Sequence, residues 1–296
     1  MSTEPNDLTN RARKLRRFGV VLLALVAASV AFRLLGSFEL GHTSLVFIGI
    51  PALLAWIVAA AAPPKTAFGS VMRTTTLALL ISWIFLGEAF ICVLMAAPIF
   101  YLVGACIAFF KEQRDGPGRS LTAIFLLPLA LEGTHPTLSV PREREVIVDG
   151  VVAAQVADVR ARLAAPPPFE RELPLFFRLG FPTPNEPRGG GLDVGDRWVI
   201  PFAHGGHHPG ELILSVKESA PHRVRFVAVS DDSYITHWLW WREAIVELAP
   251  AGDGRTHVRW TLRYGRRLDP SWYFDPLEKY GVTLAAEYLL ATLTTP

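Results

Sequence analysis

Residues 256–290 read THVRWTLRYG RRLDPSWYFD PLEKYGVTLA AEYLL and combine two different hydrophobic periods. In Thr256–Tyr264, apolar and polar side chains alternate with the period of two that a half-buried β-strand requires. After Asp269-Pro270, large apolar side chains return at helical spacing, at Phe274, Leu277, Tyr280, Leu284, Tyr288 and Leu289. The sequence therefore predicts a strand that is followed directly by a long C-terminal helix.

Upstream of this pair, four more runs carry the alternation or the β-branched and aromatic residues of strands. They are Asp196–Phe202, Glu211–Lys217, Arg223–Ser230 and His237–Leu248. A further run, Arg144–Asp149, precedes two segments with helical spacing, Val151–Leu163 and Phe169–Leu179. The turn Ala-Gly-Asp-Gly at 251–254 joins the last two strands as a hairpin. Each strand has one polar face, so the pattern predicts an antiparallel sheet with one solvated side.

This order of strand, two helices, antiparallel strands and closing helix resembles the START-like helix-grip superfamily, also called SRPBCC or polyketide cyclase-like proteins. The resemblance covers residues 140–296 and includes Pro276-Leu277-Glu278 and Glu287-Tyr288-Leu289-Leu290 on the last helix. It implies an α+β domain at 136–296, in which an antiparallel sheet wraps around the long helix and leaves an apolar cavity between them. Members bind lipids, sterols and other hydrophobic ligands, and a few are cyclases or hydrolases. No single set of catalytic residues defines the superfamily, so the resemblance transfers none.

Long apolar runs dominate the N-terminal half, and a membrane-spanning helix needs roughly 20 such residues. Phe18–Leu35 and Ser44–Ala62 meet this length. Thr74–Phe110 is too long for one helix, and we expect it to divide near Pro98, because proline favours a helix start. A fifth run, Leu121–Leu131, is short enough either to cross the membrane or to lie in its interface.

The positions of Lys and Arg predict the orientation of these helices, because short basic loops stay in the cytoplasm. Basic residues occupy alternate connections, at Arg11, Arg13, Lys14, Arg16, Arg17, Lys65, Arg73, Lys111, Arg114 and Arg119. The pattern predicts a membrane α-helical region of four or five helices at 18–135, behind a basic cytoplasmic tail at 1–17. The expected location is the plasma (inner) membrane, with the N-terminus in the cytoplasm.

The side of the membrane that the C-terminal domain occupies depends on residues 120–135. A crossing by this segment makes the domain extracytoplasmic, and we favour it because the apolar residues would otherwise face water. Alternatively, residues 1–31 form a cleaved signal peptide that ends at Ser29-Val30-Ala31. The apolar run continues past that site to Leu35, so we expect an uncleaved anchor.

Composition argues against several classes of protein. Residues 1–135 hold 11 Lys and Arg against 7 Asp and Glu, whereas residues 136–296 hold 18 against 20, so the soluble half lacks the basic excess of a nucleic-acid binder. Both cysteines, Cys92 and Cys106, lie in apolar runs, which rules out a disulfide framework in the soluble half. The short motifs of serine hydrolases, P-loop NTPases, zincins and dinucleotide enzymes are absent from the sequence.

The alternation of the strands selects the side chains that should point towards the closing helix. Broad aromatic and aliphatic walls of this kind suit a hydrophobic ligand. The predicted ligand-contacting residues are Trp198, Phe202, Leu214, Phe226, Trp238, Trp240, Trp260, Leu262 and Tyr264. Converging ionisable groups would indicate an enzyme, but these faces are almost wholly apolar. No catalytic residue and no cofactor is therefore predicted.

Two further sets of residues were weighed as functional sites. His204, His207 and His208 lie in one turn and could share a zinc ion, but flanking glycines leave them unpositioned and no nearby cysteine completes a structural site. No metal site is predicted there. Glu88 is an acid in the middle of an apolar run, where carboxylates are costly and often functional. Without a basic partner at its depth, it is expected to be protonated or hydrogen-bonded between helices.

The sequence thus predicts membrane-tethered binding of a hydrophobic small molecule or lipid-like ligand, in the cavity of a helix-grip domain. The expected partners are that ligand and the membrane, with no nucleic acid. A polyketide cyclase-like or hydrolase enzyme that uses the same cavity is the first alternative. A transporter function of the membrane half is the second, and only Glu88 supports it.

Overall fold

The computed structural model describes residues 58, 64–86, 90–112, 131–167, 169, 171–178, 181–203 and 210–294. The chain divides into two compact units, Met1–Pro128 and Leu129–Pro296.

Two helices, α3 (Ala67–Leu86) and α4 (Phe90–Glu112), make up most of what is described of the N-terminal unit. They pack along each other, and the hydroxyl oxygens of Thr76 and Tyr101 lie 2.8 Å apart across the contact. Within the described residues, no helix combines the length and the apolar character needed to cross a membrane. Glu88 and the predicted helix Phe18–Leu35 fall outside the described residues.

Pro98 does not divide the helix, so the predicted break at this position is wrong. It lies inside α4, which continues through the proline despite the loss of one backbone donor. The neighbouring Ala96 and Ala97 are the best helix formers and support this continuation. The described part of α3 ends at Leu86, and α4 is described from Phe90.

The C-terminal unit contains one curved antiparallel sheet, which the described residues show as eight strands. The strands are β1 (Glu143–Val152), β2 (Thr183–Pro184), β3 (Arg188–Gly189), β4 (Arg197–Ala203), β5 (Gly210–Ala220), β6 (Arg223–Asp231), β7 (Leu239–Pro250) and β8 (Thr256–Arg266). Their order is β1-β8-β7-β6-β5-β4-β2, and β3 also pairs with β4. The chain therefore joins its first strand to its last, which leaves β1 at an edge.

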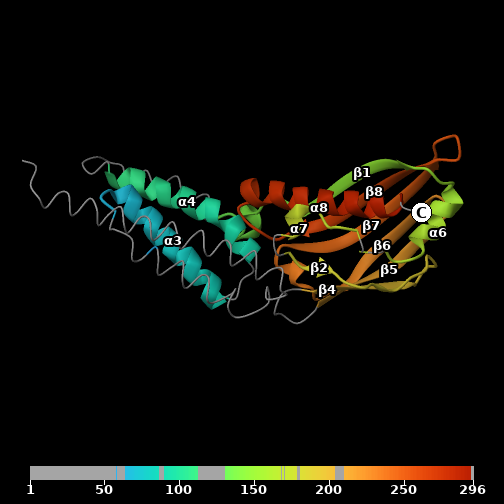
Figure 1. Cartoon of the computed structure of the whole chain (residues 1–296), viewed down its shortest axis with the longest axis horizontal. Coiled ribbons are helices and arrows are strands. Elements are labelled where there is room, and N and C mark those ends of the chain that lie inside the picture. The colour runs from blue at the N-terminus through green and yellow to red at the C-terminus, as the bar shows by residue number, and fades with distance from the viewer. Residues whose placement is uncertain are drawn as a thin grey trace, which may run out of the picture. The chain divides into compact units, whose positions relative to one another are not determined.

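The long helix α8 (Ser271–Thr292) lies against this sheet and contacts β1 and β8 (Figure 1). Shorter helices complete the unit, namely η3 (Pro136–Leu138), α6 (Val156–Leu163), α7 (Leu175–Arg178) and η4 (Tyr234–His237). A curled antiparallel sheet around a C-terminal helix is the helix-grip arrangement, so the predicted fold of the C-terminal domain is confirmed.

The end of the first strand and the start of the first helix of this unit differ from the sequence prediction by several residues. Strand β1 continues to Val152, which pairs with Thr256, so the first helix starts at Val156 rather than at Val151. Gly150 lies inside the strand. A Cβ added at this position would lie 2.7 Å from Leu290 of α8. This glycine allows the close approach of the helix and does not end the strand.

The predicted helix at Phe169–Leu179 is reduced to the single turn of α7. Pro174 comes directly before α7, and the residue before a proline is disfavoured in the helical conformation. The helix therefore cannot extend towards the N-terminus through this position.

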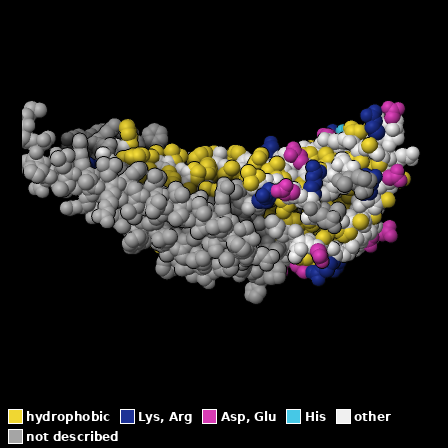
Figure 2. Space-filling model, in the orientation of Figure 1, with side chains coloured by type: hydrophobic (Ala, Val, Ile, Leu, Met, Phe, Trp, Pro, Cys, Tyr) yellow, Lys and Arg dark blue, Asp and Glu magenta, His cyan; other side chains and the backbone are white. Residues whose placement is uncertain are grey.

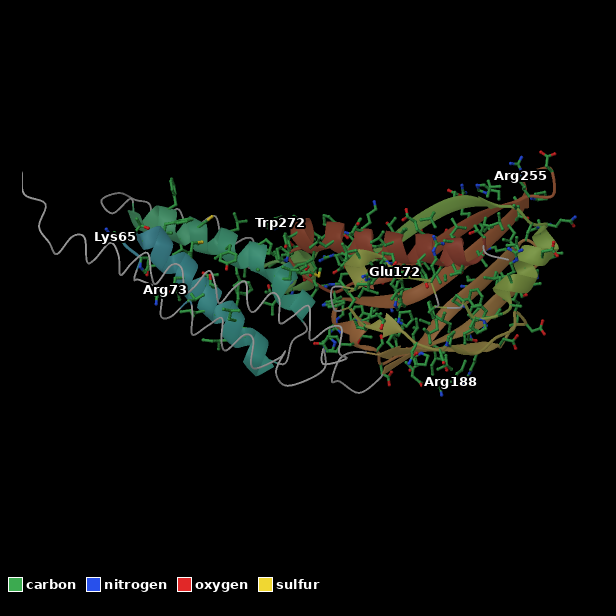
Figure 3. All side chains as sticks on the ribbon, in the orientation of Figure 1. Lys65, Arg73, Glu172, Arg188, Arg255 and Trp272 are labelled. Carbon is green, nitrogen blue, oxygen red and sulfur yellow. The ribbon has the colours of Figure 1, made fainter. Side chains whose placement is uncertain are left out.

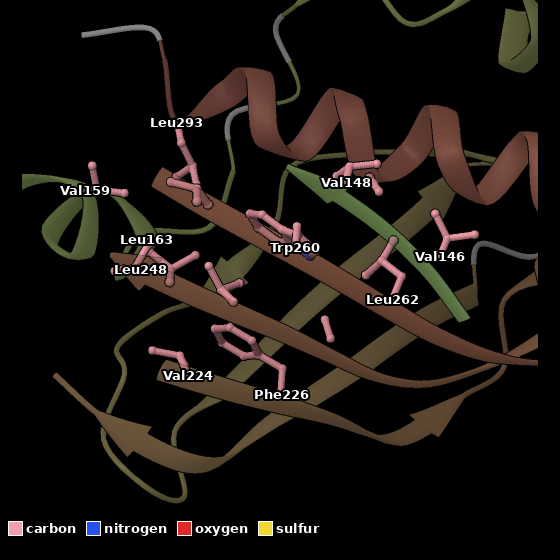
Figure 4. Packing of buried hydrophobic residues seen from close by; sticks show 14 of the residues in the cluster. Val146, Val148, Val159, Leu163, Val224, Phe226, Leu248, Trp260, Leu262 and Leu293 are labelled. Atoms are coloured by element: carbon pink, nitrogen blue, oxygen red, sulfur yellow. The ribbon is translucent and has the colours of Figure 1, made fainter. Parts of the chain in front are cut away.

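One hydrophobic cluster lies between α8 and the sheet (Figure 4). Strand β8 contributes every second residue to it, including Val258, Trp260 and Leu262. Helix α8 contributes Val282 and Ala286, one helical turn apart. Every second side chain of β8 thus points into the core, as the alternation in the sequence predicted.

On the face shown in Figure 2, charged side chains of both signs are scattered over the C-terminal unit, and the visible part of the described N-terminal unit is mainly hydrophobic. On the outer sheet face, Arg263 pairs with Glu145 at 3.0 Å and with Glu243 at 2.6 Å. Exposed pairs of this kind contribute about 0–1 kcal/mol each to stability. They therefore mark the solvated side of the sheet more than they stabilise it.

Candidate functional site

A row of polar side chains crosses three neighbouring strands on the sheet face that α8 covers. Arg144 of β1 is paired with Tyr264 of β8, and Tyr264 is paired with Trp241 of β7. Residues that are paired across antiparallel strands place their side chains on the same face of the sheet. The next row on this face, Val146 and Leu262, is wholly apolar. The polar row therefore lies at one end of an apolar surface.

Helix α8 places two carboxyl groups over this row. Asp275 accepts hydrogen bonds from Arg144 Nε on both carboxylate oxygens, at 2.8 and 3.0 Å. Glu278 follows three residues later, on the same face of the helix. Only 5% of Glu278 is exposed, and its Oε1 accepts a hydrogen bond from the backbone N–H of Leu268 at 3.4 Å. The helix thus adds a paired acid and an almost completely buried one.

Eight buried side-chain atoms have no hydrogen-bond partner among the described residues, and five of them lie on the covered sheet face or on α8. Four of these are the hydroxyl of Tyr264, Oε2 of Glu278, and the indole Nε1 atoms of Trp241 and Trp260. The fifth is Nε of Arg266, whose guanidinium is already paired with Asp269 through another nitrogen. Buried polar atoms in native proteins almost always have a partner, in the protein or in ordered water. The first four atoms, three on the sheet and one on α8, therefore mark a candidate site for a bound group.

Burial raises the pKa of Glu278 to about 8. The Leu268 N–H and the positive charge of Arg266 oppose this rise, and the charges of Asp275 and Asp269 add to it. Burial also raises the pKa of Tyr264, and the negative charge of Glu278 contributes to that shift. At neutral pH both groups are therefore protonated and can donate a hydrogen bond.

A buried ion cluster anchors the start of α8 beside this site. Arg266 is fully buried, donates to Asp269 Oδ1 at 2.6 Å and lies 3.8 Å from Glu132. Arg142 donates to the other oxygen of Asp269, also at 2.6 Å. Glu132 accepts a hydrogen bond from the N–H of Ser271, the first residue of the helix. Strand β8, the segment before β1 and the first turn of α8 are held together in this way.

This cluster lies at one end of the unit, because it joins the end of β8 to the start of α8. Trp272 projects from the first turn of α8, and Arg255 marks the β7–β8 hairpin at the opposite end (Figure 3). The polar row lies near the Trp272 end, because Arg144 is close to the start of β1 and Tyr264 is close to the end of β8.

The structure brings most of the predicted ligand-contacting residues to the covered face. Trp198, Phe226, Trp260, Leu262 and Tyr264 belong to the main hydrophobic cluster. Phe202 lies in a neighbouring cluster, and the half-buried Leu214 packs against both. Trp238 is buried elsewhere, with its ring 4.3 Å from that of Phe181.

Trp198 has a structural role that the prediction did not include. Its indole N–H donates to the carbonyl of Gly191 at 3.0 Å, and its ring lies 4.6 Å from that of Phe226. Both its polar atom and its ring are therefore occupied within the fold. This separates it from Trp241 and Trp260, whose indole nitrogens lack a partner.

Trp240 faces away from α8, so its predicted inward orientation is wrong. It is 38% exposed, and its ring lies 4.8 Å from the Arg267 guanidinium and 5.7 Å from that of Arg242. A β-bulge shifts the register of β7 between Trp241 and Glu243. The extra residue reverses the alternation, so Trp241 takes the inward position that simple counting gives to Trp240.

Sequence reasoning missed Glu278 as a site residue because it followed only the large apolar side chains of α8. Of these, Tyr288 is buried, but Tyr280 is 55% exposed. The buried face also runs through Glu278, Val282 and Ala286, at a spacing of four residues. The spacing of four residues between Glu278, Val282 and Ala286 was the signal in the sequence that could have identified Glu278 as buried.

His204, His207 and His208 lie outside the described residues. Among the residues that the structure does describe, no group of three His, Cys, Asp or Glu side chains is arranged to hold a metal ion.

A separate groove of about 570 Å³ runs along the outer seam between β1 and α8. It is lined by Ile147, Val148, Asp149, Gly150, Val151, Arg171, Thr283, Glu287, Leu290, Ala291 and Thr294. None of the nine predicted ligand-contacting residues is among them. The groove depends on the packing of a helix against an edge strand, which the sequence pattern does not specify.

No protein-family model matches the chain, and no curated protein matches it. Several solved structures, however, match the chain. Norcoclaurine synthase from Thalictrum flavum, in complex with dopamine and hydroxybenzaldehyde, is 15% identical, with 52% of this chain and 86% of that chain covered and a TM-score of 0.36. A START superfamily protein from Mycobacterium smegmatis is 13% identical, over 51% and 94% of the chains, with a TM-score of 0.35. A protein from Nitrosospira multiformis is 18% identical, over 51% and 94%, with a TM-score of 0.32. The helix-grip assignment rests on the strand order and register described above.

Proposed function

We propose that the C-terminal unit binds a hydrophobic or lipid-like ligand on the sheet face that α8 covers. The observation that carries this proposal is the set of four partnerless polar atoms at the polar end of an apolar surface. A buried polar group without a partner costs about 1–3 kcal/mol. A ligand that supplies the missing partners offsets this cost, while its apolar part gains roughly 25 cal/mol for each Å² removed from water.

We further propose that the N-terminal unit tethers this domain to the plasma membrane. Residues 90–110 contain no Lys, Arg, Asp or Glu. Large hydrophobic side chains of α4 are exposed, including Phe100, Leu102 and Phe109 at 51–58%. A contiguous apolar surface of this kind is unfavourable in water, which supports burial in lipid. Tethering would keep the domain next to the bilayer, where hydrophobic ligands concentrate.

Native mass spectrometry of the purified full chain tests the ligand-binding proposal. We expect a defined apolar molecule to be released on collisional activation, at a stoichiometry of one per chain. Removal of this molecule by organic extraction should lower the melting temperature, and its return should restore it. Repeated preparations with neither a bound molecule nor a ligand-dependent melting temperature would refute the proposal.

Fractionation tests the membrane proposal separately. The full chain should stay with the membrane pellet in alkaline carbonate and leave it in detergent, as integral membrane proteins do. Reporter fusions after residue 112 and at Pro296 then locate the two ends. We expect the first to be cytoplasmic, from the distribution of basic residues. We expect the second to be extracytoplasmic, because the apolar residues of Leu121–Leu131 would otherwise face water. Release of the chain by carbonate would exclude tethering by membrane-spanning helices.

Catalysis at the same site is the second candidate function. The observation in its favour is Glu278, an ionisable group that faces the row of Arg144, Tyr264 and Trp241 and whose pKa burial raises to about 8. Acids with a pKa near the working pH are effective proton donors. A turnover assay would detect it as a covalent change in the extracted ligand after incubation with the wild-type chain but not with Glu278→Gln.

A further inference from the structure

The four partnerless atoms share one property, which is that each can donate a hydrogen bond at neutral pH. The indoles of Trp241 and Trp260 are donors only, and the Tyr264 hydroxyl has no acceptor within the described residues. Glu278 is neutral in this setting, because burial opposes its ionisation, and its Oε1 already accepts from Leu268. The missing partner must therefore be a hydrogen-bond acceptor.

Tyr264 and Glu278 come from β8 and α8, which contact each other, and both side chains are buried with an oxygen that has no partner among the described residues. A negative charge on Glu278 would raise the pKa of Tyr264, so the two groups lie within electrostatic range of each other. Trp241 lies directly opposite Tyr264 on the neighbouring strand. Cross-strand neighbours have Cβ atoms about 4.5–5.5 Å apart, so Trp241 supplies a third donor beside Tyr264.

The fixed charges around the two donors cancel, which excludes a strong preference for an ionic ligand. Arg144 of β1 is paired with Asp275 of α8. The guanidinium of Arg266 on β8 is matched by Asp269, in the loop before α8, and by Glu132. A carboxylate or an ammonium group on the ligand would find no unmatched counter-charge among these residues.

We propose that Tyr264 and Glu278 donate two hydrogen bonds to one carbonyl oxygen of a neutral hydrophobic ligand, such as a ketone or an ester. This inference rests on the proposed ligand-binding function and specifies the chemical class of the ligand. Two converging O–H donors in an apolar surround hold a carbonyl oxygen and favour negative charge on it. A tyrosine beside a protonated carboxylic acid is a known arrangement for this purpose.

A matched pair of fluorescent probes tests the inference on the full chain. The first is propionyl-dimethylaminonaphthalene, a neutral ketone, and the second is its propyl analogue, which lacks the oxygen. We expect the ketone to bind about tenfold more tightly, as two hydrogen bonds of about 0.5–1.5 kcal/mol each predict. Equal affinities for the two probes would overturn the carbonyl site and leave the proposed function intact. Binding of neither probe would count against the proposed function itself.

Substitutions test whether Tyr264 and Glu278 cause the preference for the ketone over the propyl analogue. Tyr264→Phe should lower the affinity for the ketone by about five- to tenfold and leave that for the propyl analogue unchanged. Tyr280→Phe, on the exposed side of α8, should change neither affinity. An equal loss for both probes in Tyr264→Phe would reduce its role to packing and overturn the proposal.

The pH dependence of binding separates Glu278 from a purely structural residue. The wild-type affinity for the ketone should fall as the pH rises through about 8, because the Glu278 carboxylate no longer donates. Glu278→Gln keeps an N–H donor, so its ketone affinity should stay within about threefold of wild type at pH 7 and lose this pH dependence. An unchanged pH profile in Glu278→Gln would refute the assignment.

Two further results would also overturn the proposal. The anionic analogue dimethylaminonaphthoate should bind more weakly than the ketone, and tighter binding would show an anion site instead. Glu287→Gln alters a residue of the outer groove. Two results together would show that the probe lies in that groove. Glu287→Gln would lower the affinity for the ketone, and Glu278→Gln would leave the pH dependence of ketone binding unchanged.

Discussion

Replacement of Glu278 by glutamine should make the C-terminal unit more stable at alkaline pH and leave it nearly unchanged at acidic pH. Glutamine has the shape of the protonated acid but cannot ionise. Burial raises the pKa of this glutamate from 4.5 to about 8 in the folded protein. The wild-type side chain must therefore either hold a proton or ionise in a nearly dry environment, and glutamine avoids both.

The sign of the effect follows from proton linkage. Below pH 4.5 the carboxyl group is protonated in both the folded and the unfolded chain, and its full contribution to stability is present. Between pH 4.5 and about 8 only the unfolded chain releases the proton, so the free energy of unfolding falls as the pH rises. One unit of pKa difference corresponds to about 1.4 kcal/mol, so the total loss by pH 9 is roughly 4–5 kcal/mol.

Urea unfolding of the two proteins at a series of pH values measures this difference. Tryptophan fluorescence reports mainly on the C-terminal unit, because six of the eight tryptophans lie there. The stability of Glu278→Gln minus that of wild type should rise from about zero at pH 4 towards a plateau above pH 8. Other titrating groups are common to both proteins and cancel in this difference. Parallel pH profiles for the two proteins would refute the assignment of a buried, protonated Glu278.

Three further changes test the fold around the site. Trp260→Ala should cost about 3–5 kcal/mol of unfolding free energy, whereas Trp240→Ala, at the exposed position, should cost less than about 1 kcal/mol; similar losses in urea unfolding would contradict the bulge in β7. Gly150→Ala should destabilise the unit, because the new Cβ would lie 2.7 Å from Leu290, and Leu290→Ala should restore part of the loss; a neutral Gly150→Ala would contradict the close packing of α8 on β1. Residues 129–296 alone should unfold cooperatively in urea, because their core is self-contained; a non-cooperative transition by circular dichroism would contradict this boundary.

The sequence predicted those features that depend on local pattern. The alternation in Thr256–Tyr264 and the helical spacing after Pro270 indicated β8 and α8 directly, since neighbouring residues alone decide both patterns. The element order was then sufficient to predict the helix-grip fold. Most inward residues followed from the same alternation, because a strand without a bulge keeps it from end to end.

The errors arose where a distant part of the chain decides the outcome. Trp240 was misplaced because the bulge in β7 is a feature of its pairing with β8, not of its own sequence. The predicted strand stopped at Asp149, because the sequence pattern does not show that Leu290, which is remote in sequence, packs against Gly150. The polar row escaped notice for the same reason, since Arg144, Tyr264 and Trp241 are brought together only by the strand register.

The placement of the two acids on α8 explains why Glu278 is the neutral one. Asp275 and Glu278 are one turn apart, so both cannot face the sheet as charged groups without repulsion. Arg144 reaches Asp275 through both carboxylate oxygens, whereas no basic side chain hydrogen-bonds to Glu278 within the described residues. The proton therefore belongs on Glu278.

The ion cluster at the start of α8 fixes the position of the protonated Glu278, as binding to a ligand requires. A two-donor site must hold its groups within about 0.5 Å of the required geometry. The buried Arg266 ties Asp269 to the end of β8, and Glu132 caps the first residue of the helix, less than two turns before Glu278. The ion cluster thus fixes the helix end that carries Glu278 against the strand that carries Tyr264. A buried ion pair is weak evidence for stability, because desolvation offsets most of the attraction. Its position beside the two unpartnered donors instead provides the precise placement that a bound carbonyl oxygen requires.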